Sequence, residues 1–227
     1  MPREPRAILF DLDDTLYPLR QFVLSGFREV ARHLAEATGR DERPFYLALA
    51  RASRRGRGRE LQACVRRFGL PVDLVPGLID VIRGHRPSLR LPSASAHALR
   101  ALRPGWRIAI VTNGVPEIQA RKIVALGLGA AVDTVVFATA CGTGAGKPAR
   151  EPFLEALHRL DVPASRAVFV GDDGRCDLLG AVRAGLRAIH LTRTGVTSPW
   201  ADAGVRSIAA VPFVASTLIE RQRIHAA

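Results

Sequence analysis

The sequence predicts an α/β fold in which a doubly wound parallel sheet carries an inserted helical domain. Five short apolar segments are rich in Val, Ile and Phe and are continuous rather than alternating, as expected of strands buried on both faces. Helical segments separate most of these strands, which is typical of repeated strand–helix units. No convincing strand occurs between residues 11 and 106, and a connection of that length indicates an inserted domain.

The first expected strand, Ala7–Phe10, is followed by the insertion. We expect residues 1–16 and 92–227 to form the sheet-containing core and residues 17–91 to form the insertion. The arginine-rich patch Ser53–Glu60 is expected to be a loop within it, and Arg86–Ser95, with two prolines and three serines, to be the linker that returns to the core. The helices expected in the insertion are Gln21–Ala37, Pro44–Ser53, Glu60–Phe68 and Val72–Arg83.

Strands and helices alternate after this linker. Pro116 stands at an expected helix start, where its missing N–H group has no intrahelical partner to lose, and Gly127 and Gly185 stand where helices should end. The elements expected here are the helices Ala94–Leu102, Pro116–Leu126, Glu151–Leu160 and Asp177–Ala184, and the strands Arg107–Thr112, Thr134–Ala138, Ala167–Val170 and Arg187–Leu191.

Composition narrows the class of protein. Apolar residues make up 48% of the 227 residues and charged residues 24%, which excludes a disordered tail protein and a collagen-like fibre. No apolar run is long enough to span a bilayer, the N-terminal segment lacks the pattern of a signal peptide, and the three cysteines show no CxxC spacing. We therefore expect a cytoplasmic protein in a reducing compartment, with no membrane partner.

The formal net charge of +12 is unusual, and of the 33 cations only Lys122 and Lys147 are lysine. A solvated basic surface is the simplest interpretation, and nucleic-acid binding is a weaker alternative. A cluster of arginines in the insertion has the same two interpretations, a solvated surface or nucleic-acid binding. A third is that an arginine of this cluster binds a carboxylate or second phosphate of a substrate. These arginines are Arg51, Arg54, Arg55, Arg57, Arg59, Arg66 and Arg67.

An acidic cluster, DLDDT, directly follows the first strand. It contains Asp11, Asp13 and Asp14, with Thr15 next to them. Two carboxylates about 4 Å apart repel each other by roughly 1–4 kcal/mol, so a compensating cation is expected. An acidic turn or helix cap is the alternative interpretation, and we expect that role for Asp14 and for Asp173; Thr15 could cap a turn or contact phosphate.

Polar residues also follow three later strands. Thr112 ends one strand, and its hydroxyl and the following amides could hold a phosphate; Lys147 follows the next strand, in GKP. Asp172, Asp173 and Asp177 follow a fourth strand, in GDDGRCD. Because the carboxyl ends of parallel strands share one edge of a sheet, these groups should meet there. GTGAGKP is not a phosphate-binding loop of the Walker A type, since it lacks the first glycine and the final Ser or Thr.

Together these segments resemble the four motifs of the haloacid dehalogenase-like (HAD) hydrolase superfamily. The motifs occur in order as Asp11–Thr15, Val111–Asn113, Lys147 with Pro148, and Gly171–Asp177. The resemblance implies a Rossmann-like core and identifies the insertion as a helical C1-type cap. Dehalogenases of this superfamily lack the second aspartate of the first motif, so the presence of Asp13 favours phosphoryl chemistry. The loop before Lys147 departs from the pattern because it carries no acidic residue.

The resemblance also implies a role for each motif residue. Asp11 would be the nucleophile that forms an aspartyl-phosphate, and Asp13 the general acid and then the base. Mg²⁺ would bind Asp11, the Asp13 carbonyl and Asp172, with Asp177 orienting it from the outer shell.

Phosphoryl binding completes these implied roles. Thr112 and the Asn113 amide would hold the transferring phosphoryl group, and Lys147 would neutralise its charge. The implied function is hydrolysis of a small phosphorylated metabolite. The alternatives are a phosphomutase, a nucleotide or polynucleotide-end phosphatase, and a non-catalytic basic binding protein. Tyr17 weakly favours a phosphatase of nucleotides. The substrate and the oligomeric state are left open.

Overall fold

The computed structural model describes residues 5–54 and 58–225. The chain forms two compact units: a core unit, Met1–Pro18 with Arg90–Ala227, and a helical unit, Leu19–Leu89. The insertion expected from the sequence spans 17–91, and its assignment as a cap stays a prediction. Among the described residues, no helix is long and apolar enough to cross a membrane.

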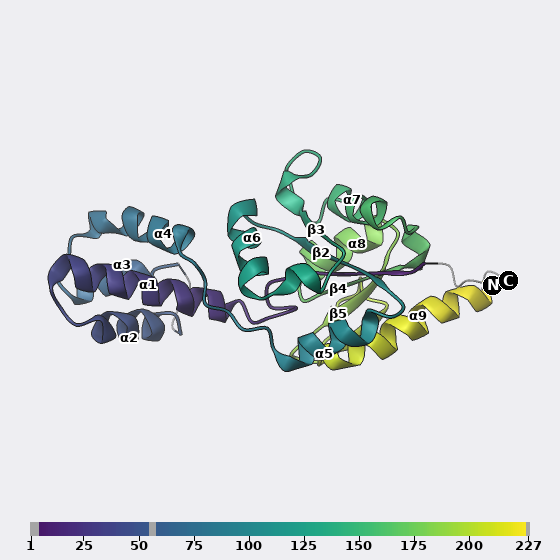
Figure 1. Ribbon diagram of the computed structural model, residues 1–227, viewed down its shortest axis with the longest axis horizontal. Helices are drawn as coiled ribbons and strands as arrows, with labels where there is room; N and C mark the ends of the chain where they lie inside the picture. The colour runs from purple at the N-terminus through teal and green to yellow at the C-terminus, as the bar shows by residue number, and fades with distance from the viewer. Residues whose placement is uncertain (1–4, 55–57, 226–227) are drawn as a thin grey trace. The chain divides into compact units, whose positions relative to one another are not determined.

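Six parallel strands form the sheet of the core unit in the order β3-β2-β1-β4-β5-β6 (Figure 1). The chain proceeds outward from β1 in one direction and then outward from β4 in the other, so the strand order reverses between β1 and β4. This confirms the doubly wound parallel sheet, and such a reversal places a ligand crevice at the carboxyl ends of β1 and β4. The strands are β1 Ala7–Phe10, β2 Arg107–Thr112, β3 Thr134–Phe137, β4 Ala167–Gly171, β5 Arg187–Leu191 and β6 Ala203–Val205.

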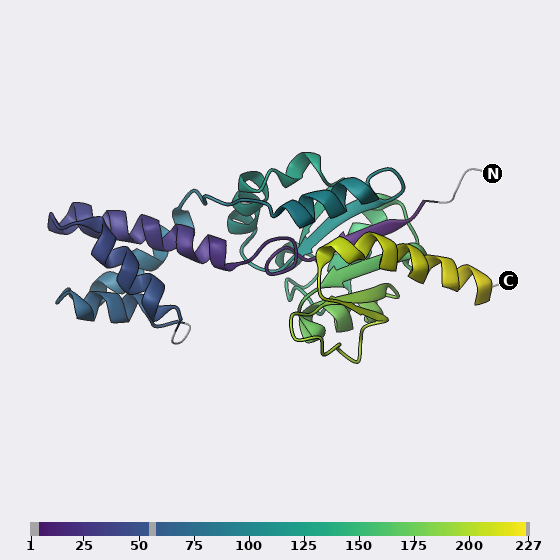
Figure 2. The ribbon, with the colours of Figure 1, turned by 90° about the horizontal axis from the view of Figure 1, so that it is seen from below.

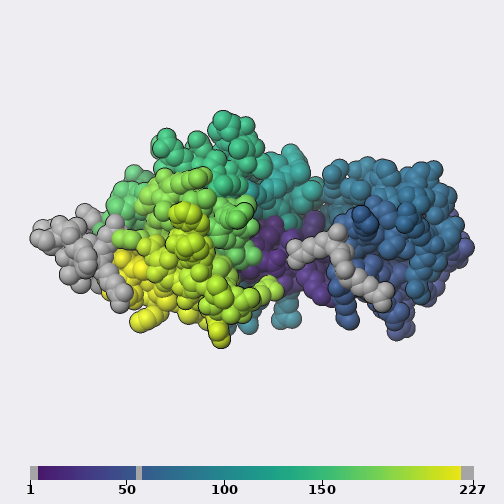
Figure 3. Space-filling model, turned by 180° about the vertical axis from the view of Figure 1, so that it is seen from behind, coloured from purple at the N-terminus to yellow at the C-terminus, as the bar shows by residue number. Residues whose placement is uncertain are grey.

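Helices cover both faces of the sheet. Helices α7 (Glu151–Leu160) and α8 (Leu179–Arg183) cover one face, and α5 (Ser93–Leu102) and α9 (Val211–His225) cover the other (Figures 1 and 2). Every residue of β1 and β4 is buried, which explains their continuous apolar sequences. Over the core unit, the surface drawn in Figure 3 is made mostly by green and yellow segments that follow β3.

Helix α6 (Pro116–Ala125) follows β2 and buries polar side chains. Its inner face carries Gln119, Lys122 and Ile123, whereas Val124 is 79% exposed. Burial of an amide and an ammonium group is costly unless both are hydrogen-bonded, so this face of α6 indicates a polar network.

The sequence predicts most of these elements correctly. The bounds of β1, β2, β5 and α7 match the expected ones, and the other matched strands differ at one end by a residue. The helix expected over Asp177–Ala184 is wrong at its start, because residues Gly174–Leu178 form a π-helical turn before α8. Strand β6 and helix α9 are not predicted from the sequence; β6 is only three residues long and contains Gly204, which weakens its pattern.

The described residues of the helical unit form four α-helices with their own apolar core. Phe27, Val30 and Leu34 of the first helix pack in one cluster with Phe45 and Leu49 of the second. The helices are α1 Arg20–Thr38, α2 Glu42–Ala52, α3 Glu60–Arg67 and α4 Val75–Gly84.

Two expectations about this region need correction. The helix expected over Val72–Arg83 begins as a 3-10 turn, Val72–Leu74, and becomes α-helical at Val75, beside Pro76. The last three residues of the expected linker, 93–95, belong to α5. Residues 55–57 of the expected arginine-rich loop lie outside the described residues, as do residues 1–4 of the N-terminal segment.

Candidate active site

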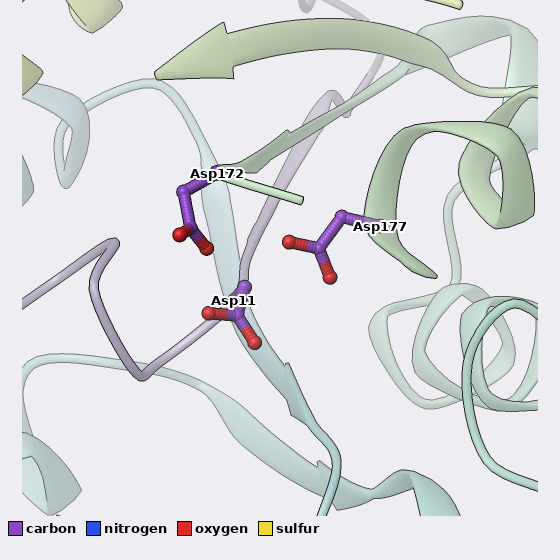
Figure 4. Close-up of side chains that lie close together, drawn as sticks. All are labelled: Asp11, Asp172 and Asp177. Carbon is purple, nitrogen blue, oxygen red and sulfur yellow. The ribbon is translucent and has the colours of Figure 1, made fainter. Parts of the chain in front are cut away.

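Three aspartates meet at the carboxyl edge of the sheet. Asp11 follows β1, and its N–H group donates to the Val170 carbonyl at 2.9 Å, which extends the pairing of β1 with β4 by one residue. Asp172 follows β4, and Asp177 lies in the π-helical turn. The carboxylates of Asp11, Asp172 and Asp177 point toward one another, and one oxygen from each lies within 4.8 Å of the others (Figure 4).

The π-helical turn directs Asp177 into the core unit. The Asp173 carboxylate accepts hydrogen bonds at 2.8 Å from the backbone N–H groups of Arg175 and Cys176, so Asp173 caps the turn as the sequence predicts. Position 171 requires a glycine because the Asp177 side chain lies against its backbone, and a Cβ atom there would overlap the Asp177 carboxylate. Asp177 is therefore buried against the end of β4, at 2% exposure.

Lys147 joins two of these aspartates. Its Nζ donates to Oδ1 of Asp11 and to Oδ1 of Asp177, both at 2.6 Å, and its side chain is 2% exposed. Asn113 fixes the lysine backbone: its Oδ1 accepts from the Lys147 N–H at 2.8 Å, and its Nδ2 donates to the Lys147 carbonyl at 3.0 Å. Gly146 has a φ of 70°, and a Cβ there would lie 2.7 Å from Asn113 Oδ1. A glycine in the turn before Lys147 therefore leaves room for the Asn113 side chain.

The three carboxylates carry more negative charge than the one lysine neutralises. Burial raises the pKa of Asp11 to about 7, against the opposing effect of Lys147, and Asp177 raises it further. Burial and the nearby Asp11 and Asp14 raise the pKa of Asp172 to about 6. Burial also raises the pKa of Asp177. A cation with oxygen ligands fits this cluster, because it would relieve both the repulsion and the burial cost.

The carboxylates of Asp11 and Asp177 also shift the pKa of Lys147. Burial alone would lower the pKa of Lys147, but Asp11 and Asp177 outweigh it and the net shift is upward. Lys147 is therefore an ammonium ion at neutral pH, held beside Asp11.

Asp13 and Thr112 form a second polar group next to α6. Oδ1 of Asp13 accepts from the Tyr17 hydroxyl at 2.6 Å, and Lys122 Nζ donates to both Asp13 oxygens. Gln119 Nε2 donates to Thr112 Oγ1 at 2.6 Å. The Asp13 carboxylate is thus held by α6, apart from the three-aspartate cluster; the expected metal ligand at this position is its carbonyl oxygen.

Gln119 and Lys122 were not predicted as site residues from the sequence. One signal could have identified Lys122: it is one of only two lysines in a chain that otherwise uses arginine. Gln119 lies one turn earlier on the same face of α6, and it has no comparable signal.

Thr15 and Asp14 of the first motif contact segments that lie far away in the sequence. Thr15 Oγ1 donates to Asp172 Oδ1 at 3.4 Å, which ties the segment after β1 to the segment after β4. Asp14 adopts a positive φ of 59° and pairs with Arg193 at 3.2 Å.

Comparisons with known proteins agree with this geometry. A glyceraldehyde 3-phosphate phosphatase from Methanopyrus kandleri is 30% identical over 200 residues, covering 83% of this chain and 84% of the relative. A ribulose-1,5-bisphosphate 5-phosphatase from Halopiger xanaduensis is 31% identical over 211 residues, covering 81% and 83%. The crystal structure of a 2-haloacid dehalogenase from Pseudomonas syringae superposes with a TM-score of 0.65 at 26% identity, covering 94% of this chain and 99% of that one.

A model of one protein family also matches residues 5–185, which include β1 to β4, the π-helical turn and every residue of the three-aspartate cluster. That family is described as haloacid dehalogenase-like hydrolase. The chain therefore belongs to the haloacid dehalogenase-like hydrolases.

Proposed function

We propose that this protein is a phosphatase that hydrolyses a small phosphorylated metabolite, with Asp11 as the nucleophile. The observation that carries the proposal is the position of Asp11 at the strand-order reversal, where Lys147 holds one of its oxygens beside Asp172 and Asp177. The two relatives named above are phosphatases of small sugar phosphates and cover most of the chain. Both findings support phosphoryl transfer at this edge of the sheet.

Mg²⁺ is the cofactor that fits best. Asp11 and Asp172 offer carboxylate oxygens, which Mg²⁺ prefers, and no nitrogen or sulfur ligand is part of the described cluster. Asp177 is engaged by Lys147 and by the Asp173 N–H group at 3.2 Å, which suits an orienting role. When bound, the cation would neutralise charge on the phosphoryl group as it is transferred.

In the first step, an oxygen of Asp11 attacks phosphorus and the bond from phosphorus to the ester oxygen breaks. The proton on Asp13 passes to that ester oxygen, so the substrate leaves as an alcohol and Asp11 becomes an aspartyl-phosphate. The ammonium of Lys147 and the hydroxyl of Thr112 offset the charge on the phosphoryl oxygens.

In the second step, Asp13, now a carboxylate, takes a proton from water. The resulting hydroxide oxygen bonds to phosphorus, the bond to Asp11 breaks, and inorganic phosphate leaves. Asp11 returns as a carboxylate and Asp13 is protonated again. Dehalogenation does not need this second acid, so the well-held Asp13 favours the phosphatase over the dehalogenase chemistry of the structural relative.

Phosphate release from p-nitrophenyl phosphate and from a panel of phosphorylated metabolites tests the proposal. We expect turnover with Mg²⁺ and none with EDTA, and restoration when Mg²⁺ is added back. Interconversion of phosphate positions without release of phosphate would indicate a phosphomutase instead. A well-folded protein with no Mg²⁺-dependent turnover of any substrate would overturn the proposal and favour a binding protein.

A further inference from the structure

We propose that Lys122, together with Gln119, positions Asp13 for proton transfer and acts on the reaction only through Asp13. The inference rests on the proposed function, because it assigns a role to residues around the group that exchanges protons. Its basis is the juxtaposition of a buried ammonium and a buried amide on α6 with both oxygens of one carboxylate.

Donors surround the Asp13 carboxylate. Lys122 Nζ lies 2.9 Å from Oδ1 and 2.8 Å from Oδ2, the Tyr17 hydroxyl donates to Oδ1 at 2.6 Å, and Gln119 Nε2 donates to Oδ2 at 3.0 Å. Contacts to both oxygens fix the rotation of the carboxylate as well as its position. Proton transfer depends on such alignment, since a general acid must lie within hydrogen-bond reach of the atom it protonates.

Lys122 is buried for this contact. Its side chain is 5% exposed, against 23% for Asp13. Removing an ammonium from water is costly, and in this network the two oxygens of Asp13 offset the cost. A lysine on the outer face of α6 would carry the same charge without this desolvation cost. The burial of Lys122 beside Asp13 therefore indicates that the ammonium group is needed at Asp13.

Gln119 connects proton transfer to phosphoryl binding. A glutamine amide has two N–H donors, and the Nε2 atom of Gln119 lies 3.0 Å from Asp13 Oδ2 and 2.6 Å from Thr112 Oγ1. One side chain therefore sets the spacing between the proposed acid and the proposed phosphoryl-binding hydroxyl. The Thr112 hydroxyl in turn donates to the Asn113 carbonyl at 3.4 Å, a long contact that a phosphoryl oxygen would replace.

The two lysines of the chain pair with different aspartates of the first motif. Lys147 holds Asp11 next to Asp172 and Asp177, whereas Lys122 holds Asp13 next to α6. This division keeps the Asp13 carboxylate out of the three-aspartate cluster.

The test compares kcat/KM for p-nitrophenyl phosphate and for phenyl phosphate in the Lys122→Met variant. The value of kcat/KM covers steps up to departure of the alcohol, and phenolate needs a proton more than p-nitrophenolate does. We expect a loss of about 10²-fold or more for phenyl phosphate and of less than about 10-fold for p-nitrophenyl phosphate. Lys122→Arg should recover part of the loss. Arg100→Met, which removes an exposed cation from α5, is the matched control.

A double-mutant cycle shows whether Lys122 acts through Asp13. Once Asp13→Asn has removed the acid, adding Lys122→Met should cost almost nothing further. Multiplicative losses, or equal losses for the two substrates in Lys122→Met, would overturn the inference while the wild-type activity left the proposed function intact. If Lys122→Met does not fold, Lys122→Gln provides the same comparison, and equal losses for both substrates there would also overturn it.

Discussion

Asp11, the proposed nucleophile, meets two opposing requirements, because a nucleophile must be ionised and Asp11 is buried among other acids. Lys147 is the group that reconciles them, since it donates to Asp11 while Asp177 holds it from the other side. The network explains why a lysine, with three donors on a compact ammonium, stands at this position in an arginine-rich chain.

We expect Asp11→Asn to abolish turnover and to leave the fold intact. Asparagine has nearly the same shape and can still accept from Lys147, but its amide cannot form the aspartyl-phosphate. The loss in kcat should exceed about 10³-fold, measured with p-nitrophenyl phosphate, with an unchanged circular dichroism spectrum. Near-normal rates would refute the assignment of Asp11 as nucleophile.

Lys147→Ala should lower both activity and stability. Activity should fall by orders of magnitude because charge on the phosphoryl group loses its partner, and about 3–5 kcal/mol of unfolding free energy should be lost because two buried carboxylates lose their counter-ion. Urea unfolding and steady-state kinetics measure the two effects. An unchanged rate would mean that Lys147 has no role in the reaction.

Sequence patterns locate the residues that follow strands, since their positions at strand ends predict that Asp11, Lys147, Asp172 and Asp177 lie close together. The donors to Asp13 could not be found in this way. They lie on the inner face of a helix, where a buried lysine and an exposed lysine have the same sequence signature, and only the packing of α6 distinguishes them.

At the scale of elements, two aspartates anchor the starts of the edge strands β3 and β6, each to the strand beside it. The N–H of Asp133, which precedes β3, donates to the Ile108 carbonyl at 2.8 Å, and its Oδ2 accepts from the Ile108 N–H at 2.7 Å. Asp202, which precedes β6, makes the same pair of bonds with Ala188 of β5, both at 2.8 Å. The repeated arrangement fixes the register at both edges of the sheet, including that of the three-residue β6, which is not predicted from the sequence.

Asp133→Ala should destabilise the protein by about 1–3 kcal/mol, because the buried Ile108 N–H group loses its acceptor. Burial raises the pKa of Asp133, but the Ile108 N–H and Arg103 outweigh it and lower the pKa below its usual value. A lowered pKa in the folded state means that this stabilisation is present at neutral pH and is lost as pH falls below about 4.

Unfolding in urea at pH 7 and at pH 3 measures this effect. The difference between wild type and variant should narrow at the lower pH, and Asp202→Ala should show a similar loss at pH 7. Asp80→Ala, at an exposed position of α4, is the control and should change stability by less than about 0.5 kcal/mol. An Asp133→Ala variant as stable as the wild type would contradict the anchoring role.

At the scale of the whole molecule, the cluster of Asp11, Asp172 and Asp177 lowers stability when no cation is bound. Its raised pKa values mean that the folded protein holds more protons than the unfolded chain between about pH 4 and pH 7. Within that window the contribution of these groups to stability falls as pH rises. Binding of Mg²⁺ requires the ionised carboxylates, so it should reverse this loss.

The melting temperature should therefore rise on addition of Mg²⁺, and it should rise more at pH 8 than at pH 5.5. Thermal unfolding monitored by circular dichroism, with Mg²⁺ or with EDTA, measures the difference. Asp172→Asn, which removes one proposed ligand and one negative charge, should reduce the response to Mg²⁺. A shift that is equal at both pH values would contradict competition between protons and the cation.

The division of the chain into units illustrates what sequence can and cannot predict at this scale. The long interval after β1 marks an insertion, and the helical unit Leu19–Leu89 has its own apolar core. Substrate choice is not encoded in any local motif. It depends on which side chains face the substrate, and the arginines between residues 51 and 67 have no pattern that distinguishes a binding face from a solvated one.

Detection of a phosphorylated Asp11 tests the central claim most directly. The wild-type protein, quenched in acid during turnover with Mg²⁺ and p-nitrophenyl phosphate, should yield a peptide spanning residues 7–20 with the added mass of one phosphoryl group on Asp11. The Asp11→Asn protein treated in the same way should yield the unmodified peptide. Sustained turnover with a phosphoryl group on another residue would contradict the account.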